Sequence, residues 1–153
     1  MKYCLDTSAL IEPWARHYPP DLFKPVWEKI AELIEAGHVR APVEVRRELE
    51  RQEDALLKWA KGAKGLFEEV DDAQLKVAKD IVNKYPSLVK PNSTRSQADP
   101  FVIALAEVHG VAVITYETRA KKDEAPKIPN VCADRRIQMV SFVDLLRKEG
   151  FKA

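Results

Sequence analysis

The second half of the chain contains the feature that most limits its fold, a helical pattern followed directly by a strand pattern. Residues 99–110, "DPFVIALAEVHG", carry apolar residues at helical spacing, and "VAVIT" at 111–115 is rich in β-branched residues. A last strand is expected in "IQMVS" at 137–141, before an amphipathic helix at 142–150. Because strands separated by helices favour a parallel sheet, the sequence predicts a three-layer α/β/α sandwich with a central, mostly parallel sheet.

The first half of the chain fits the same scheme. A short strand is expected at 2–5 and a helix over 21–36, ending at Gly37, because helices often end at glycine. "HVRAP" at 38–42 predicts a second strand, and Pro42 would open the helix that follows it. The apolar positions of the helix over 21–36 are Leu22, Val26, Trp27, Ile30, Leu33 and Ile34.

Two more helices are expected before the long loop. One passes through Leu56, Leu57 and Trp59, and the next begins at Asp71 and Asp72 and stops before Pro86. The residues of that second helix expected to face inward are Leu75, Ala78, Ile81 and Val82. "YPSLVKPNSTRSQ" at 85–97 predicts a long connection, and the segment between Glu117 and the last strand predicts a basic, proline-containing loop.

Size and charge limit the kinds of protein this chain can be. Its 153 residues, 46% hydrophobic and 32% charged, predict one globular domain spanning 1–153. The net charge of +1 excludes a protein held to nucleic acid by its overall charge, so such binding would depend on local basic clusters. The alternative for these clusters is a solvated helix face and a mobile loop. The clusters are Arg40, Arg46, Arg47 and Arg51, and Arg119, Lys121, Lys122 and Lys127.

Apolar segments and cysteines in the sequence bear on where the protein is located, but they do not point to a reaction. The chain has no apolar run of membrane-spanning length and no signal-peptide pattern, which predicts a cytoplasmic protein without membrane association. Cys4 and Cys132 form no C-x-x-C pair, so buried or idle thiols are expected rather than a zinc site or a disulfide.

Acidic residues occur where predicted strands end or helices begin. Asp6 follows "KYCL", Asp99 precedes "PFVIALA", and Glu117 comes just after "VAVIT". Because the carboxyl ends of parallel strands meet at one edge of a sheet, these side chains are expected to lie together. A fourth acid is expected from the helix "PVEVRRELER", where Glu48 is the first candidate and Glu44, one turn earlier, competes with it.

Each of these acids also has an ordinary explanation. Asp6 would cap a helix that follows the first strand, and Asp99, with Pro100 after it, has the pattern of an N-cap. Glu48 and Glu117 would be solvated surface residues. Capping and metal binding are compatible, because an Asp can use one oxygen for each. Several carboxylates in one cleft repel each other unless a cation neutralises them, and such oxygen ligands select Mg²⁺ or Mn²⁺.

The order of three segments resembles a known family. "CLDTSALI", "APVEVRRELER" and "ADPFVIALAEVHGVAVITYETR" together resemble the PIN-domain nucleases, which include the VapC-like toxin ribonucleases of bacterial and archaeal toxin–antitoxin systems. The resemblance covers nearly the whole chain. It implies a PIN-like fold and a Mg²⁺- or Mn²⁺-dependent ribonuclease that hydrolyses RNA phosphodiester bonds as the toxin of such a pair.

The resemblance also implies roles for the four acids. Asp6, Glu48 and Asp99 match family acids that would hold a first metal ion. Glu117 stands where the family usually has Asp, and it would help with a second metal or position the attacking water. This is a departure from the family pattern, because Glu is longer by one methylene.

Other residues are candidates for auxiliary roles. Ser8 or Thr115 would orient a metal-bound water or a phosphate oxygen, and Arg119 is a candidate contact to substrate. For the two hydroxyls the alternative is an ordinary helix-start or strand-end residue. The three histidines have no partner in any motif and are expected to be surface or packing residues. They are His17, His38 and His109.

Two competing functions and several partners remain as expectations. Haloacid-dehalogenase-type phosphatases also place Asp after a first strand, but they need a second Asp two positions on, where this chain has Ser8. The other alternative is a weakly active or inactive PIN-like module that binds protein or RNA. By resemblance, the partners would be single-stranded or looped RNA, an antitoxin protein and a second copy of the chain. Trp27, Trp59 and Phe67 would belong either to the core or to such an interface.

Overall fold

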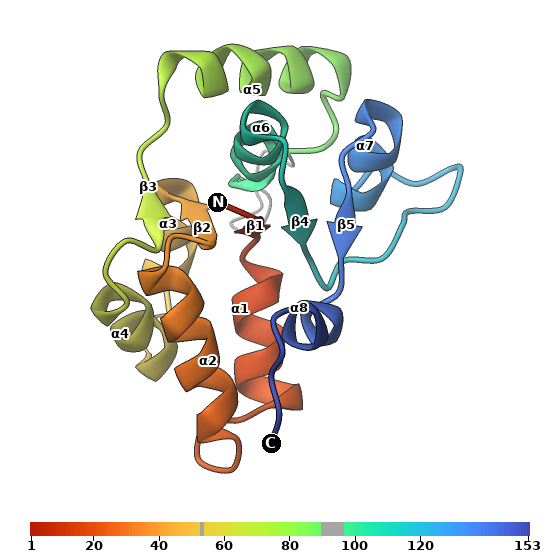
Figure 1. Ribbon diagram of the computed structural model, residues 1–153. Helices are drawn as coiled ribbons and strands as arrows, with labels where there is room; N and C mark the ends of the chain where they lie inside the picture. Colours follow the sequence, from red (N-terminus) through yellow and green to blue (C-terminus); the bar gives the residue numbers. More distant parts are fainter. Residues whose placement is uncertain (53, 90–96) are drawn as a thin grey trace.

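Five parallel strands form the centre of the protein, in the order β3-β2-β1-β4-β5 (Figure 1). The computed structural model describes residues 1–52, 54–89 and 97–153. Each neighbouring pair of strands is parallel. The strands are β1 (Tyr3–Leu5), β2 (Val39–Pro42), β3 (Phe67–Glu68), β4 (Ala112–Ile114) and β5 (Met139–Val140). The predicted parallel sheet is confirmed, with β1 at its centre.

One face of the sheet is covered by α6 (Asp99–His109), which packs against β1, β2 and β4. α5 (Asp72–Lys84) lies on the outer side of α6, and α7 (Ile128–Arg135) lies beside it (Figure 1). The Arg135 guanidinium joins these three helices, because it donates to Glu107 at 2.6 Å and to Asp80 at 2.9 Å.

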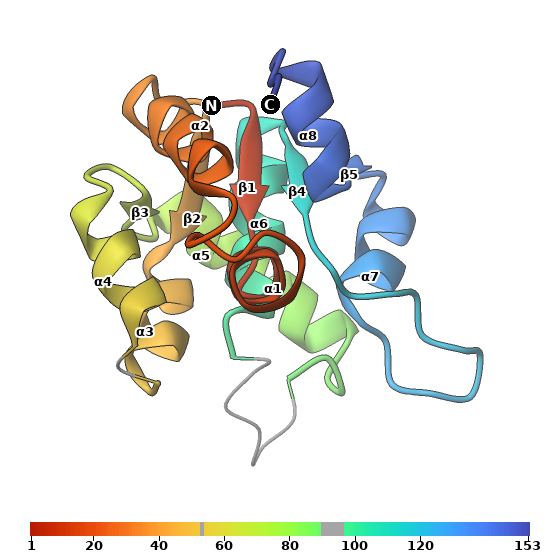
Figure 2. The same cartoon turned by 90° about the horizontal axis from the view of Figure 1, so that it is seen from below.

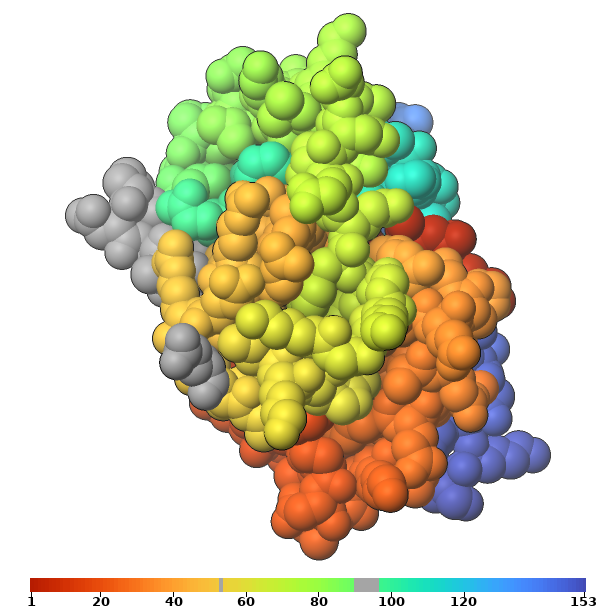
Figure 3. All heavy atoms as spheres, turned by 90° about the vertical axis from the view of Figure 1, so that its left-hand side faces the viewer, coloured from red at the N-terminus to blue at the C-terminus, as the bar shows by residue number. Residues whose placement is uncertain are grey.

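The other face is covered by helices from both ends of the chain (Figure 1). α1 (Ser8–Glu12) continues into the π-helix η1 (Pro13–His17), and α2 (Lys24–Glu35) and α8 (Phe142–Lys148) lie alongside. α3 (Val43–Glu50) and α4 (Ala55–Gly62) lie at the β3 end of the sheet, where they fill much of the surface in Figure 3. This arrangement confirms the predicted three-layer sandwich.

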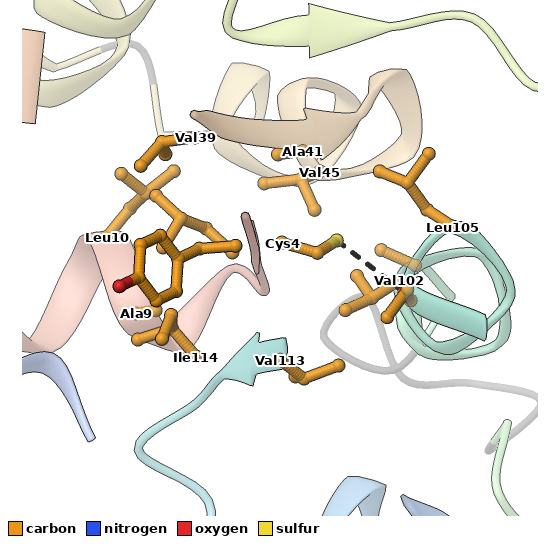
Figure 4. Close-up of a cluster of buried hydrophobic side chains, with 14 of the residues drawn as sticks. Cys4, Ala9, Leu10, Val39, Ala41, Val45, Val102, Leu105, Val113 and Ile114 are labelled. Atoms are coloured by element: carbon orange, nitrogen blue, oxygen red, sulfur yellow. Dashed lines mark hydrogen bonds between the residues drawn. The ribbon is translucent and has the colours of Figure 1, made fainter. Parts of the chain in front are cut away.

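The central strand is buried on both faces, as expected for the middle of a parallel sheet. The Cys4 thiol faces α6 and donates to the Val102 carbonyl at 3.5 Å, whereas Leu10 lies on the α1 side of the strand (Figure 4). Cys4 and Cys132 are both free and buried, which confirms the expectation for the thiols.

Both chain ends lie on the side of the molecule where the strands begin (Figure 2). α8 runs back along the sheet, so that Glu149 accepts a hydrogen bond from the Tyr3 hydroxyl at 2.7 Å. Lys2 Nζ lies 3.5 Å from the same carboxylate. The carboxyl ends of the strands are therefore at the opposite edge from the termini.

Several sequence-based boundaries need correction. The helix expected from residue 21 begins at Lys24, and Leu22 lies in the preceding turn with 73% of its surface exposed. In α5 only Ala78 and Ile81 of the four expected residues are buried, because this helix packs on α6 through one narrow face; Leu75 and Val82 are exposed. The predicted end at Gly37 is confirmed, since Gly37 follows α2 with a φ of 82°.

Three elements were not predicted. β3 is only two residues long, η1 is a π-helix, and α7 occupies Ile128–Arg135, where a loop was expected. The strands expected at 2–5, 111–115 and 137–141 are present but shorter. Residues 90–96 of the loop predicted at 85–97 lie outside the described residues.

Three aromatic residues, Trp27, Trp59 and Phe67, were expected to lie either in the core or at an interface. Trp27 is buried, whereas Trp59 and Phe67 are partly buried and pack against the core. Trp14 joins Trp27 and Trp59 in a cluster with ring centroids 4.9–5.8 Å apart. Within the described ranges, none of the helices has the length and apolar character needed to cross a membrane.

Candidate active site

A cleft of about 510 Å³ opens at the carboxyl edge of the sheet. Segments from three regions of the chain meet there: the α1–η1 segment, the start of α6 and the loop after β4. The lining residues are Asp6, Thr7, Ser8, Ile11, Glu12, Arg16, His17, Asp99, Tyr116 and Glu117. Three of the four acids predicted from the sequence therefore share one cleft.

Asp6 is held rigidly where β1 ends and α1 begins. It is only 1% exposed. Its Oδ1 accepts from the Ala9 N–H at 2.8 Å and from the Ser8 hydroxyl at 2.7 Å, and its Oδ2 accepts from the Thr115 hydroxyl at 2.6 Å. The Ala9 contact confirms a capping role. Burial raises the pKa of Asp6 to about 7, with the charge of Glu117 adding to the rise and these hydrogen bonds opposing it.

Ser8 and Thr115 connect Asp6 to the backbone after β4. The Ser8 hydroxyl oxygen accepts from the Tyr116 N–H at 2.9 Å, and the Thr115 hydroxyl oxygen accepts from the Glu117 N–H at 3.0 Å. Both hydroxyl protons point to Asp6, so in this arrangement the two side chains orient that carboxylate. Ser8 also lines the cleft.

Asp99 is the first residue of α6, and the expectation that it caps this helix is wrong. Ala98 is the N-cap and already has helical backbone angles, so the Asp99 side chain makes no capping hydrogen bond. It is 6% exposed and lines the cleft. Burial raises the pKa of Asp99 strongly, and the charges of Glu117, Asp6 and Glu48 raise it further. The four acids therefore act on one another electrostatically.

Glu48, rather than Glu44, is the helix acid nearest the site. It accepts a hydrogen bond from the Thr7 hydroxyl and a second one from the Ala98 N–H at 3.4 Å. It is 7% exposed, so the solvated-surface explanation is wrong for it. Burial raises the pKa of Glu48, while Thr7, Ala98 and the charge of Arg51 lower it. Glu44 instead pairs with Arg47 at 3.2 Å.

Glu117 lies between the cleft and α7. Its Oε2 accepts from the Ile128 N–H at 3.2 Å, so it satisfies one free donor at the start of that helix. It is partly buried, which differs from the solvated-loop explanation. Burial raises the pKa of Glu117, and the Ile128 N–H and the charge of Lys127 lower it. The partner was not anticipated because α7 was not predicted.

The donor chemistry of the cleft fits a hard divalent cation. Carboxylate oxygens are what Mg²⁺ and Mn²⁺ prefer, and the acids raise each other's pKa in a way that a cation would reverse. As the side chains lie, the described part of the chain contains no group of three His, Cys, Asp or Glu residues arranged to hold a metal. Glu48 and Glu117 would have to exchange their present hydrogen bonds for the metal to complete such a group.

The sequence did not indicate five of the lining residues: Ile11, Glu12, Arg16, His17 and Tyr116. His17, expected to be a surface or packing residue, stacks on Tyr116 with ring centroids 5.1 Å apart. Only the continuation of α1 into η1 brings Arg16 and His17 to the cleft, and no local motif signals that. Arg119 is exposed and does not line the cleft.

The first basic cluster predicted from the sequence is only partly available to bind nucleic acid. Arg40 donates to the Ile34 and Val39 carbonyls, both at 2.8 Å, and so serves the fold. Arg46 and Arg47 pair with acids of their own helix, Glu50 and Glu44. Of these three residues only Arg40 has a clearly structural role, because Arg46 and Arg47 are in exposed ion pairs that contribute little to stability.

The fold and the cleft define a parallel α/β domain with buried acids at the carboxyl edge of its sheet, which is compatible with a PIN-like fold. The family model for a domain of unknown function, DUF4411, matches residues 3–153. The chain belongs to this family. A search among curated proteins found no match.

Proposed function

We propose that this protein is a metal-dependent ribonuclease with a PIN-like domain. The observation that carries the proposal is the meeting of Asp6, Asp99 and Glu117 in one cleft at the carboxyl edge of a parallel sheet. Buried carboxylates that raise each other's pKa are costly to the fold, and such groups concentrate at functional sites.

The proposed cofactor is Mg²⁺ or Mn²⁺, held by Asp6 and Asp99 with Glu48 and Glu117. When bound, such an ion lowers the pKa of a coordinated water and stabilises the charge that develops on a phosphodiester. Ser8 and Thr115 keep the Asp6 carboxylate oriented through their hydroxyl protons. Glu117 stands at the cleft wall, where its carboxylate would accept the proton of the attacking water.

The proposed substrate is single-stranded or looped RNA, whose exposed backbone can bend into a cleft of this kind. The choice of RNA, and the role as toxin of a cytoplasmic toxin–antitoxin pair, come from the resemblance of the sequence to VapC-like proteins. Partner binding and homodimer formation are part of the same proposal. The exposed apolar residues Leu75 and Val82, which line a groove with Phe101, support a protein contact on α5.

A second candidate is an inactive PIN-like module that binds RNA or protein. The hydrogen bonds of Glu48 and Glu117 favour it, because both carboxylates already have partners in the chain. The two candidates differ in metal affinity, since a binding module does not need a divalent cation.

The test combines cleavage and metal binding. A labelled single-stranded RNA is incubated with the protein in Mg²⁺, in Mn²⁺ and in EDTA, beside Asp99→Asn and, as a matched control, Glu44→Gln. Metal-dependent cleavage that Asp99→Asn loses and Glu44→Gln keeps is the expected result. Calorimetric titration with Mn²⁺ accompanies it. RNA binding without cleavage or metal affinity would favour the inactive module, and full activity of a folded Asp99→Asn protein would overturn the nuclease.

A further inference from the structure

A π-helix forms one wall of the candidate active site. η1 (Pro13–His17) continues α1, and its last two residues, Arg16 and His17, line the cleft. π-Helical turns are rare in proteins and are found frequently at functional sites. Here the wider turn is the segment that carries two side chains suited to nucleic acid toward the buried acids.

The imidazole of His17 lies flat against the phenol ring of Tyr116. Their centroids are 5.1 Å apart and their planes differ by 14°. His17 is exposed, whereas Tyr116 is partly buried. The pair thus presents a flat aromatic surface, in which the His17 ring is accessible to solvent and the Tyr116 ring lies between it and the rest of the protein.

The inner ring is fixed to both the core and the site. Tyr116 packs against Phe142, with centroids 6.3 Å apart, and Phe142 is 1% exposed. The Tyr116 N–H donates to the hydroxyl oxygen of Ser8, which itself donates to Asp6. Burial raises the pKa of Tyr116 to about 12, so the phenol stays neutral at physiological pH. Two hydrogen bonds, from the Tyr116 N–H to Ser8 and from the Ser8 hydroxyl to Asp6, therefore connect the stacked pair to the Asp6 carboxylate.

A positive charge stands beside the stacked pair. Arg16 is the neighbour of His17 in η1, and 72% of its side chain is exposed. Its guanidinium lies 3.1 Å from the Glu12 carboxylate, and an exposed pair of this kind contributes little to stability. Arg16 can therefore turn from Glu12 to a phosphate at small cost.

We propose that the His17–Tyr116 pair is a stacking platform for one unpaired nucleobase of an RNA substrate, and that Arg16 contacts a phosphate next to that nucleotide. The proposal rests on the proposed nuclease function and names the part of the substrate that this wall of the cleft recognises. Proteins that bind single-stranded RNA commonly stack bases on aromatic and histidine rings, and such stacking tolerates any base. The platform would hold the strand so that its backbone runs toward the acids.

The test measures binding in EDTA, where metal-dependent cleavage does not occur. Two labelled single-stranded oligomers of equal length are compared, one with all its bases and one abasic. His17→Ala is expected to weaken binding of the normal oligomer about tenfold and to leave the abasic oligomer unchanged. His17→Phe, which keeps a flat ring, is expected to restore binding to within about twofold. His38→Ala, at the opposite edge of the sheet, is the matched control and should bind like the parent protein.

Arg16→Gln separates charge from stacking, because a phosphate contact does not depend on the base. This variant is expected to weaken both oligomers by a similar factor. A base analogue, 2-aminopurine, placed in the normal oligomer should lose fluorescence on binding the parent protein and regain it with His17→Ala. Circular dichroism checks that each variant is folded.

The platform is overturned if His17→Ala binds the normal oligomer as the parent does, or weakens the abasic oligomer equally. Failure of His17→Phe to restore binding would also overturn it. Cleavage by the parent protein in Mg²⁺ is scored separately. Base-dependent binding without cleavage would overturn the nuclease and keep the platform. Metal-dependent cleavage by the parent, together with unchanged binding of the normal oligomer by His17→Ala, would overturn the platform and keep the nuclease.

Discussion

Thr7 donates its hydroxyl proton to a carboxylate oxygen of Glu48, 41 residues further along the chain. The other oxygen of that carboxylate accepts the N–H of Ala98, just before α6. One buried side chain thus joins the starts of two helices that bring Asp6 and Asp99 into the cleft. Glu48 therefore has a structural role whatever its role in metal binding.

The first prediction concerns this link. Glu48→Ala is expected to lower the free energy of unfolding by about 1–3 kcal/mol, because the Thr7 hydroxyl and the Ala98 N–H lose their buried acceptor. Urea denaturation measures the change. Thr7→Ala should cost less, and the double variant should cost less than the sum of the two. Glu50→Ala, two residues further along α3, removes a carboxylate that is 43% exposed, so it is the control and should change stability by less than about 0.5 kcal/mol. Additive effects of the Thr7 and Glu48 changes would contradict the link.

The second prediction is a pH effect on the metal-free protein. The pKa of Asp6 is about 7 in the folded state against 3.8 normally, so between these values the folded state binds more protons than the unfolded state. Stability in EDTA should therefore fall as pH rises from 5 to 8. Asp6→Asn, which keeps an acceptor for the Ala9 N–H, should be more stable than the parent at pH 8 by at least about 1 kcal/mol. The gain should shrink at pH 5, and its persistence there would contradict the explanation.

The third prediction links metal binding to proton release. Asp6 and Asp99 both have raised pKa values, so a cation must displace protons that these groups carry near neutral pH. Mn²⁺ affinity is expected to rise at least about tenfold from pH 6 to pH 8. Calorimetry in two buffers with different ionisation enthalpies should show released protons. Asp99→Asn should bind Mn²⁺ more weakly, and a pH-independent affinity would argue against binding at these carboxylates.

The fourth prediction separates the two contacts of Glu117. Glu117→Gln keeps an oxygen for the Ile128 N–H and removes a charge that repels Asp6 and Asp99, so its stability should fall by no more than about 0.5 kcal/mol relative to the parent. Glu117→Ala removes the acceptor and should cost about 1 kcal/mol. RNA cleavage should fall in both variants, because both lose the carboxylate. If Glu117→Gln cleaves RNA at the parental rate, this residue serves only the start of α7.

The site acids could be predicted because each has a local signal. Asp6 and Glu117 follow β-rich runs, and a parallel sheet brings such positions to one edge. The sequence favours Glu48 over Glu44 because Glu48 lies beside the apolar positions Val45 and Leu49 of the helix. In the structure, its contacts with Thr7 and Ala98 bury it. The capping prediction for Asp99 failed because the helical backbone already begins at Ala98.

The elements that escaped prediction depend on packing rather than on pattern. β3 is two residues long and exists through its pairing with β2. α7 buries Ile128, Val131 and Cys132 against the rest of the domain, although its sequence contains a proline and few strong helix formers. η1 departs from α-helical geometry where Pro13 follows α1, because proline has no N–H to continue the α-helical hydrogen bonds. The proline signals a break at this point but does not indicate that a π-helix follows.

The contact between Lys2 and Glu149 bears on where the protein can be labelled and on whether its chain can be permuted. Because the chain starts and finishes on the side away from the carboxylates, a dye, an affinity tag or a solid support attached at either end would leave the cleft open (Figure 2). The two ends themselves lie apart, one beside the sheet and the other beyond the helical layer (Figure 1), so a circular permutation would need a linker long enough to cross that layer. Such a rearrangement would change the order of the strands along the chain but not their order in the sheet.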